Sequence, residues 1–591
     1  MKNYKKVYAA FILAGGLILH GCNGIFDDLA INPNQPSMGA YFTSPSAVND
    51  AVMTMYGYMS TQRCLGASGS KTTIIRSDEA SSNSDYGKPG MFGADLNASY
   101  YTIEQPYTLM YTTASQASYI IETAPSVDFS GNEELRNAYM GEAYFWRAFA
   151  HYYLLINFRN ISPIRQMPRN GDDYVRPLEK PAAVWNFIQE DLAHAKELLP
   201  VKGYWDSKNA GRVTKASAAA LLGKAYLYRS GIEQYYGEDK TTFYSEAAKE
   251  FGDVIDGKYG TYDLTKNYAD NFDVAHENNE ESILEFQFLG DVDNAGFNPG
   301  LATSGLAFDS RGLMLPGAGV GYEGVVHNWL YNAFVNSVDK DGYTDIRMFS
   351  TMIFNDLDAS IHLRNDAGGN PVRLEGPGGY KWEELYPAKN GKEGFATVSN
   401  PLAHSFKAGI RKGIDCSMPT QTEADGTPKL VGVGAGVKEY VYNQPRAHGV
   451  NWRYIRYADV LMMYAESVVS GGTPASNMTP LQAVNKVRGR ANMSELPSVT
   501  MADIQNERIL EFALEGHRFY DLLRWGKLAS RFTELQESDP NFKKFISADD
   551  FKGFVTNKHE WLPIPINEVN SNPYITENNP GSVSYTHLRA H

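Results

Sequence analysis

Apolar residues recur with a helical period between about residues 44 and 260, and again beyond residue 450. In the segment 451–467 and just beyond it, they fall at i, i+3, i+4, i+7, i+8 and i+11, which predicts one apolar face of a helix. These residues are Tyr457, Val460, Leu461, Tyr464, Ala465 and Val468. Similar patterns predict helices over 44–59, 107–124, 132–158, 181–199, 214–229 and 243–255.

Two further helix-like segments follow in the C-terminal part. Thr479, Pro480 and Gln482 form a capping-box pattern with proline at the first helical position, which predicts a helix start. The segment 504–527 has the pattern of a single helix. One face carries Ile509, Phe512, Ala513, Gly516, Phe519 and Leu523. On this helix Glu515, Arg518 and Asp521 are spaced three apart, so we expect them to pair along its surface.

The remaining parts of the chain predict loops. The segment 64–97 is rich in Gly, Ser and Asp, and contains the adjacent acids Asp78 and Glu79. Residues 261–450 form a glycine-rich region with short apolar runs, where few helices fit. Binding specificity is expected on such loops when a rigid frame holds them.

Composition favours an ordered, globular protein that binds no nucleic acid. Hydrophobic residues make up 43% of the chain, and its net charge of −14 provides no basic surface for phosphates. Thirty-eight tyrosines and eight tryptophans supply many flat rings with polar edges. Most of them are expected in the core, but such rings also stack on sugar faces.

The N-terminus has the pattern of a secretory signal peptide over residues 1–21. Lys2, Lys5 and Lys6 precede a short apolar stretch over 11–19, which cannot span a bilayer. Cys22 follows at the position of a bacterial lipobox cysteine, although His20 replaces the usual small residue. We therefore expect a lipidated Cys22 and a tether over 22–43. An ordinary signal peptide with an incidental cysteine is the alternative.

No reaction is predicted from the candidate chemical motifs. Gly319, Gly321 and Gly324 match a dinucleotide pattern but lie in a glycine-rich loop rather than between a strand and a helix. The pair Asp78 and Glu79 is more simply interpreted as solvated loop acids than as a glycosidase pair. His517 has no nucleophile motif nearby. The charged residues in 507–524 are interpreted as a network that locks helices together.

The sequence also gives few signals for metal binding or disulfide bonds. No C-x-x-C or histidine-rich cluster predicts zinc, and no cofactor is implied. Whether calcium assists, and whether Cys64 and Cys416 pair, stays open.

Several motifs closely resemble the SusD/RagB family of outer-membrane glycan-binding lipoproteins. The C-terminal signature of that family is matched by 456–466, 483–491, 507–526 and 563–573, and its N-terminal motifs by 141–163 and 211–215. The resemblance implies a mainly α fold in which tetratricopeptide-type helix pairs form a scaffold for loop-rich insertions. It divides the mature chain into a helical region over 44–260, a variable region over 261–450 and a signature region over 451–582.

The resemblance also implies a function. Family members bind oligosaccharide at the outer membrane, facing outward, and deliver it to a SusC-like TonB-dependent barrel without changing it. Their glycan lies on an arc of aromatic rings with a few polar groups. By position, the candidates in this chain are Asp78, Tyr100, Tyr101, Tyr107, Tyr322, Trp329 and Trp382.

Alternatives remain at this point. A RagB-like binder of peptides would use the same scaffold, a helical glycoside hydrolase would need an acid pair in a deep cleft, and a generic helical adaptor would leave the signatures unexplained. The last residues, 583–591, match nothing before them and are interpreted as a foreign tail.

Overall fold

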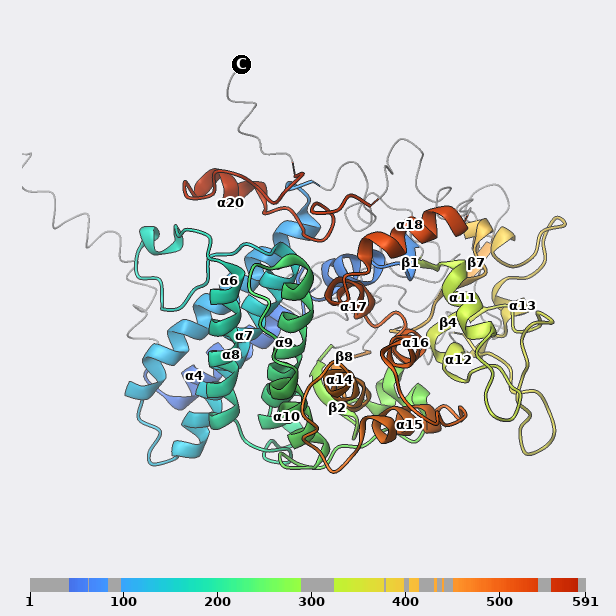
Figure 1. Cartoon of the computed structure of the whole chain (residues 1–591), viewed down its shortest axis with the longest axis horizontal. Helices are drawn as coiled ribbons and strands as arrows, with labels where there is room; N and C mark the ends of the chain where they lie inside the picture. Colours follow the sequence, from blue (N-terminus) through green and yellow to red (C-terminus); the bar gives the residue numbers. More distant parts are fainter. Residues whose placement is uncertain are drawn as a thin grey trace, which may run out of the picture.

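The computed structural model describes residues 42–61, 63–82, 97–288, 324–376, 379–397, 403–413, 430–432, 438–440, 450–539 and 554–582. Helices dominate these ranges, and the predicted mainly α fold is confirmed. In Figure 1 the helices of residues 45–255 occupy one end, those of residues 457–524 the middle, and those of residues 328–385 the other end. The last helix, of residues 566–571, lies above the first group. None of the described helices is both long and apolar enough to cross a bilayer.

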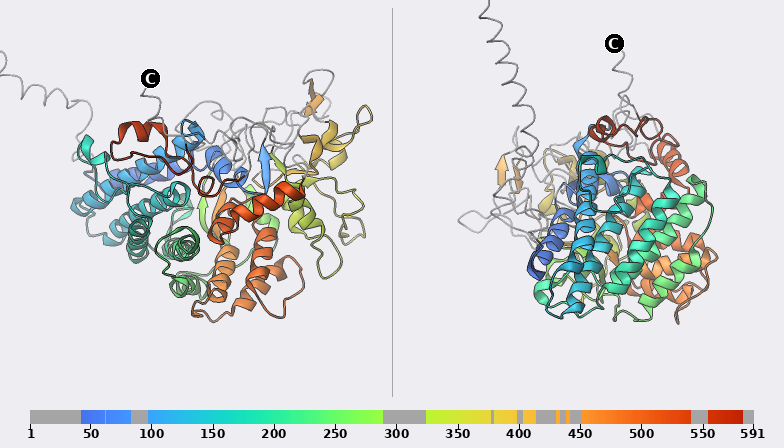
Figure 2. Two further views of the ribbon diagram at one scale, coloured as in Figure 1. Left: turned by 45° about the horizontal axis from the view of Figure 1, so that its top comes forward. Right: turned by 90° about the vertical axis from the view of Figure 1, so that its left-hand side faces the viewer.

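The N-terminal helices pack against one another in chain order. The pairs α6–α7, α7–α8, α8–α9 and α9–α10 are neighbours, and the end-on view in Figure 2 shows them side by side. Their bounds are Pro45–Met59 (α4), Tyr101–Thr123 (α6), Glu133–Phe158 (α7), Pro181–Leu198 (α8), Lys215–Tyr236 (α9) and Tyr244–Ile255 (α10). These match the predicted helices, except that α6 begins earlier and α9 ends later than the sequence pattern indicates.

Local sequence explains where these helices begin. The Ser44 side chain accepts a hydrogen bond from the amide of Ala47 at 3.3 Å, and Pro45 occupies the first helical position. The Asn132 side chain likewise accepts from the amide of Leu135 at 3.1 Å. Each cap satisfies an amide that has no partner within its helix, which favours a helix start at that residue.

In the C-terminal part, α14 (Tyr457–Val469) packs beside α9 and α10, and α17 (Arg518–Arg524) packs beside α9. Thr479 and Gln482 form the predicted capping box, so this helix start is confirmed. The elements are β8 (Trp452–Arg456), α14 (Tyr457–Val469), α15 (Pro480–Arg490), α16 (Met501–Glu511), α17 (Arg518–Arg524), α18 (Leu528–Ser538) and α20 (Ile566–Ser571).

Two helix predictions in this part are wrong. Residues 452–456 form strand β8, which pairs antiparallel with β2 (Ser282–Phe286). The predicted helix over 504–527 is interrupted, because the chain turns between α16 and α17. Leu514 has φ +62° and Gly516 has φ +86° in this turn, and a Cβ at Gly516 would lie 2.9 Å from the Thr73 hydroxyl oxygen. The apolar period continues on both sides of the turn, so the pattern alone does not reveal the break.

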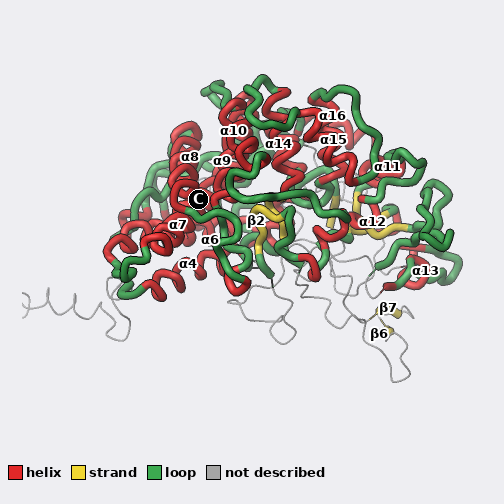
Figure 3. The backbone as a smooth tube through the Cα atoms, turned by 90° about the horizontal axis from the view of Figure 1, so that it is seen from below, coloured by secondary structure: helices red, strands yellow, loops and turns green. Residues whose placement is uncertain are grey.

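A second, smaller core forms around a four-stranded antiparallel sheet in the order β1-β3-β5-β4. Its strands are Ala80–Ser82, Gly324–Val326, Ala408–Ile410 and Met352–Phe354, in that order. Figure 3 shows these strands among the loops and short helices at one end of the molecule. The short helices there are α11 (Asn328–Val335), α12 (Arg347–Thr351) and α13 (Trp382–Leu385). The predicted loop region over 261–450 is thus largely irregular where the structure describes it.

The segment 64–97 contains regular structure that the sequence pattern did not predict. It includes α5 (Ala67–Ser70), the π-helix η1 (Lys71–Ile75) and β1. The other short elements are β6 (Leu430–Gly432), β7 (Lys438–Tyr440), and the 3-10 turns Ala124–Ser126, Gly171–Tyr174, Ser207–Asn209, Tyr268–Phe272, Val274–His276, Gly394–Thr397 and Ala403–Ser405.

The C-terminal charged residues form a buried network rather than a surface one. Arg456 is fully buried and pairs with Glu281 at 2.7 Å, Glu511 at 2.6 Å and Glu515 at 2.9 Å. Buried charges are tolerated only when partners satisfy them, and here several acids share each guanidinium. The predicted surface pairing of Glu515, Arg518 and Asp521 is therefore wrong, because the turn before α17 directs them to different partners. The prediction that these charges lock helices together agrees with the contacts.

Candidate functional site

The adjacent acids Asp78 and Glu79 are buried rather than solvated. The Asp78 carboxylate accepts from Nε of Arg518 at 2.9 Å and from Nε of Arg531 at 2.6 Å. Burial opposes its ionisation, but these guanidinium groups hold the pKa of Asp78 below its usual value. The interpretation of both residues as solvated loop acids is wrong, because α17 and α18 cover them. Asp78 as a ligand contact stays a prediction, and its carboxylate already has two cationic partners.

Glu79 lies next to this pair in a different electrostatic setting. Burial, together with the Asp78 carboxylate, raises the pKa of Glu79 to about 8. Its side chain accepts from the Leu514 amide at 2.9 Å, in the turn between α16 and α17. Glu79 is therefore a neutral acid at pH 7 that ties the N-terminal part of the chain to this turn.

Trp329 is a candidate ring whose orientation is fixed by its contacts. It lies at the start of α11 and is half-buried, and its indole N–H donates to the backbone oxygen of Asp78. The guanidinium carbon of Arg531 lies 4.2 Å from the ring centroid, and that of Arg518 lies 5.5 Å away. Cation–π contacts and one hydrogen bond therefore fix the ring orientation without burying it completely. Of the seven candidates, this structure brings Asp78 and Trp329 into contact.

Three candidates lie on or beside α6. Tyr100 and Tyr101 are half-buried at its start, and Tyr107 is almost fully buried one and a half turns further on. Tyr107 also lines a pocket of about 370 Å³ between α6 and the segment around α20. The rings of Tyr107 and Tyr111 lie 4.8 Å apart there. This pocket has hydroxyl and carboxylate groups on its walls, which suit a hydrogen-bonding ligand.

Of the last two candidates, Trp382 lies in the second core, and Tyr322 falls outside the described residues. Trp382 is a buried residue of the second core, with its ring 4.6 Å from Tyr386 and 5.1 Å from Phe395. Its packing against these two rings shows that Trp382 fills the second core. Tyr322 lies outside the described residues, as do Cys22, Cys416, Gly319 and Gly321. Cys64 is a free, buried cysteine.

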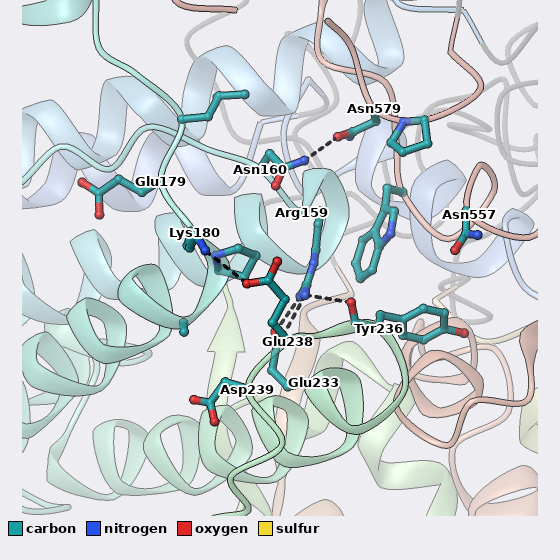
Figure 4. Close-up of a pocket in the computed structure, with 15 residues that line it drawn as sticks. Arg159, Asn160, Glu179, Lys180, Glu233, Tyr236, Glu238, Asp239, Asn557 and Asn579 are labelled. Atoms are coloured by element: carbon teal, nitrogen blue, oxygen red, sulfur yellow. Dashed lines mark hydrogen bonds and ion pairs between the residues drawn. The ribbon is translucent and has the colours of Figure 1, made fainter.

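A larger pocket of about 650 Å³ lies where α7, α8 and α9 meet the C-terminal segment 557–580 (Figure 4). None of the residues that line it is a candidate from the sequence. The Arg159 guanidinium donates to Glu233 through two nitrogens, at 2.5 and 2.8 Å. Its centre lies 5.3 Å from the Trp561 ring centroid. Arg159 is the C-cap of α7, near the end of the family-like motif 141–163, and the helical pattern of the sequence does not single it out.

The backbone at Arg159 is unusual. It has φ +63° and ψ −61°, and the next amide, of Asn160, donates to the Phe158 carbonyl at 2.6 Å. This is a γ-turn with a positive φ at a non-glycine residue, which stores about 1 to 3 kcal/mol of strain. The surrounding contacts therefore hold Arg159 in its place at the edge of the pocket.

In the part of the chain that the structure describes, no group of three or more His, Cys, Asp or Glu side chains is arranged to hold a metal ion.

Comparison with known proteins identifies the family of this chain. The sequence pattern of the SusD family matches residues 422–581, and a pattern described as "starch-binding associating with outer membrane" matches residues 31–227. A SusD-like protein of Bacteroides ovatus is 25% identical over 533 residues, which cover 89% of this chain and 83% of that protein. The chain belongs to the SusD-like family.

Solved SusD-like structures have the same fold along almost the whole chain. A SusD superfamily protein from Bacteroides vulgatus superposes with a TM-score of 0.66 at 22% identity, and the match covers 92% of this chain and 100% of that one. The surface glycan-binding protein A of Bacteroides thetaiotaomicron, solved in complex with laminarihexaose, superposes with a TM-score of 0.65 at 19% identity, covering 91% and 100%. The SusD-like fold predicted from the motifs is therefore confirmed.

Proposed function

We propose that this SusD-like protein binds an oligosaccharide at the outer membrane and delivers it, unchanged, to a SusC-like TonB-dependent transporter. Membership of the SusD-like family is the observation that carries the proposal. A solved relative of the same fold holds laminarihexaose, a neutral glucan fragment.

The contacts that orient the Trp329 ring support glycan binding. A sugar ring presents C–H groups on its faces and hydroxyls on its edge, so it binds an aromatic face with polar groups nearby. Arg518 and Arg531 fix the indole before a ligand arrives, which lowers the entropy cost of binding. We propose Trp329 as the principal ring contact, with Tyr100 and Tyr101 as further candidates.

The paired carboxylates support a non-catalytic role. A glycosidase needs two carboxyl groups placed on either side of a bound sugar bond. Asp78 is instead held by two guanidinium groups, and the buried Glu79 side chain accepts from the Leu514 amide and the Ser77 hydroxyl. This surface supplies affinity and orientation rather than acid–base chemistry.

The proposed anchor is the lipid on Cys22. Two or more acyl chains on one cysteine give stable membrane attachment, whereas one chain gives only reversible binding. Mass spectrometry of the mature N-terminus from membranes tests this part, because a diacylated Cys22 adds the mass of its acyl chains. An unmodified N-terminus in the soluble fraction would contradict it.

Affinity electrophoresis tests glycan binding. The mature protein should migrate more slowly in gels that contain one of a panel of neutral polysaccharides, and unchanged in the others. Co-purification of a TonB-dependent barrel with the tagged protein from its native membranes tests the partner. If peptides retard the protein and no polysaccharide does, the RagB-like alternative replaces this proposal.

A further inference from the structure

The larger pocket (Figure 4) is separate from the Trp329 surface in its residues and elements. Its walls come from the end of α7, the start of α8, the end of α9 and the segment 557–580. The Trp329 surface comes from α11, α17 and α18. No residue lines both.

The pocket has the size and the wall chemistry of a small-ligand site. Its volume of about 650 Å³ lies within the usual range of about 300 to 1,000 Å³. Its apolar lining residues are Leu178, Pro181, Ala182, Tyr236, Trp561 and Pro580. The centroids of the Tyr236 and Trp561 rings lie 5.8 Å apart in an edge-to-face arrangement, and the Arg159 guanidinium also contacts the Trp561 ring.

Neutral polar groups are available beside these walls. The Asn160 amide nitrogen donates to the Asn579 side-chain oxygen at 3.3 Å, while its own oxygen has no acceptor role among the described residues. Asn557 is exposed at the rim and makes no side-chain hydrogen bond within the described chain. Helix α8 starts here without a side-chain cap. Amide side chains and an uncapped helix start offer both donors and acceptors to hydroxyl groups.

Charge disfavours an anionic ligand. Two cationic and four acidic side chains line the pocket, which gives it a formal net charge of −2. Both cations are already paired, Arg159 with Glu233 at 2.5 Å and Lys180 with Glu238 at 3.1 Å. The Glu233 carboxylate also accepts from the Trp185 indole at 2.9 Å. A phosphate, sulfate or uronate would meet excess negative charge, whereas a neutral polyol would not.

We propose that this pocket is a second saccharide site, which takes a neutral sugar unit of the same oligosaccharide class. The inference rests on the proposed function and deepens it. Two sites formed by different elements of one protein would let it hold a polymer at two points, which raises the avidity without a new contact at either site.

The test blocks the pocket without touching its paired charges. Ala182 is half-buried on the pocket wall in the first turn of α8, so Ala182→Trp fills the cavity with a side chain that the helix tolerates. Ala183 is the next residue, is also half-buried, and does not line the pocket, so Ala183→Trp is the matched control. Asn160→Ala removes an amide and is the second variant if Ala182→Trp folds poorly by circular dichroism.

Native mass spectrometry and calorimetry with laminarihexaose then count the bound sugars. We expect two equivalents for the wild type and for Ala183→Trp, and one for Ala182→Trp, with Asn160→Ala about tenfold weaker at one site, or about 1.4 kcal/mol. A single equivalent that Ala182→Trp leaves unchanged overturns the second site and leaves the proposed function standing. A full panel of neutral oligosaccharides that does not bind at all overturns both. Tighter binding of oligogalacturonate than of neutral sugars in the pocket also overturns the charge argument.

Discussion

Asp78 and Arg518 lie 440 residues apart in the sequence and form a buried ion pair with 2.9 Å between Oδ1 and Nε. Arg531, in α18, forms a second ion pair with the same carboxylate. The backbone oxygen of Asp78 also accepts from Trp329. One residue thus connects the N-terminal segment, the C-terminal helices and the candidate ring, so the position of the ring depends on an interior ion pair.

Asp78→Asn is expected to destabilise the protein by about 3 to 5 kcal/mol, because it leaves two guanidinium groups without their buried counter-charge. Urea denaturation measures the change. Asp253→Asn is the matched control. Its partners Lys249 and Lys258 are more than half exposed, so its cost should be about 1 kcal/mol or less. An equal loss in the free energy of unfolding for the two variants would show that burial of the Asp78 ion pairs adds nothing to their contribution.

Gly516→Ala is expected to cost about 1 to 3 kcal/mol, because Gly516 has φ +86° and its Cβ would press on Thr73. Gly489→Ala provides the opposite case. Gly489 lies inside α15 with open space around a Cβ, so alanine should stabilise the protein by about 0.5 to 1 kcal/mol. Thermal unfolding compares the two. A stabilised Gly516→Ala variant would contradict the turn geometry.

Glu79 should make stability depend on pH. Its pKa of about 8 in the folded protein exceeds the value of about 4.3 of an unfolded glutamate, so the folded state retains a proton that the unfolded state releases. This contribution is fully present below about pH 4 and is lost as the pH rises through 8.

Glu79→Gln keeps the shape of the side chain and does not titrate. Between pH 5 and 8 its free energy of unfolding should therefore rise relative to that of the wild type. Glu238→Gln is the control, because the Glu238 side chain is 89% exposed. Denaturation curves at several pH values test this. Parallel profiles for Glu79→Gln and the wild type would mean that Glu79 is ionised in the folded protein.

Trp329→Ala should weaken oligosaccharide binding about tenfold or more, which corresponds to about 1.4 kcal/mol, because it removes the fixed ring. Calorimetry measures the dissociation constant, and circular dichroism checks the fold. Tyr574→Ala is the comparison, since Tyr574 is 60% exposed and belongs to neither candidate site. An unchanged affinity in Trp329→Ala would remove this ring from the binding surface.

Local signals in the sequence predicted the helix starts well. Ser44 followed by Pro45, and Thr479 followed by Pro480, carry their caps within four residues, so nothing distant was needed to recognise them. The apolar period also identified α7 and α14, because a buried helix face has to repeat with the helical turn.

Features that depend on distant contacts were missed. The break at Gly516 follows from the close approach of Thr73, and the burial of Asp78 follows from Arg518 and Arg531. In each case the deciding partner lies more than 400 residues away. Trp382 shows the same limit for the site, because a tryptophan in a loop-rich region looks identical in sequence whether it binds a ligand or fills a core.

Calorimetric titration with neutral oligosaccharides, followed by chromatography of the recovered sugar from the same cell, tests the central claim most directly. The account predicts saturable binding of at least one oligosaccharide, with the sugar recovered at its original length. Shortened sugar, or no heat of binding with any neutral oligosaccharide while peptides bind, would contradict it.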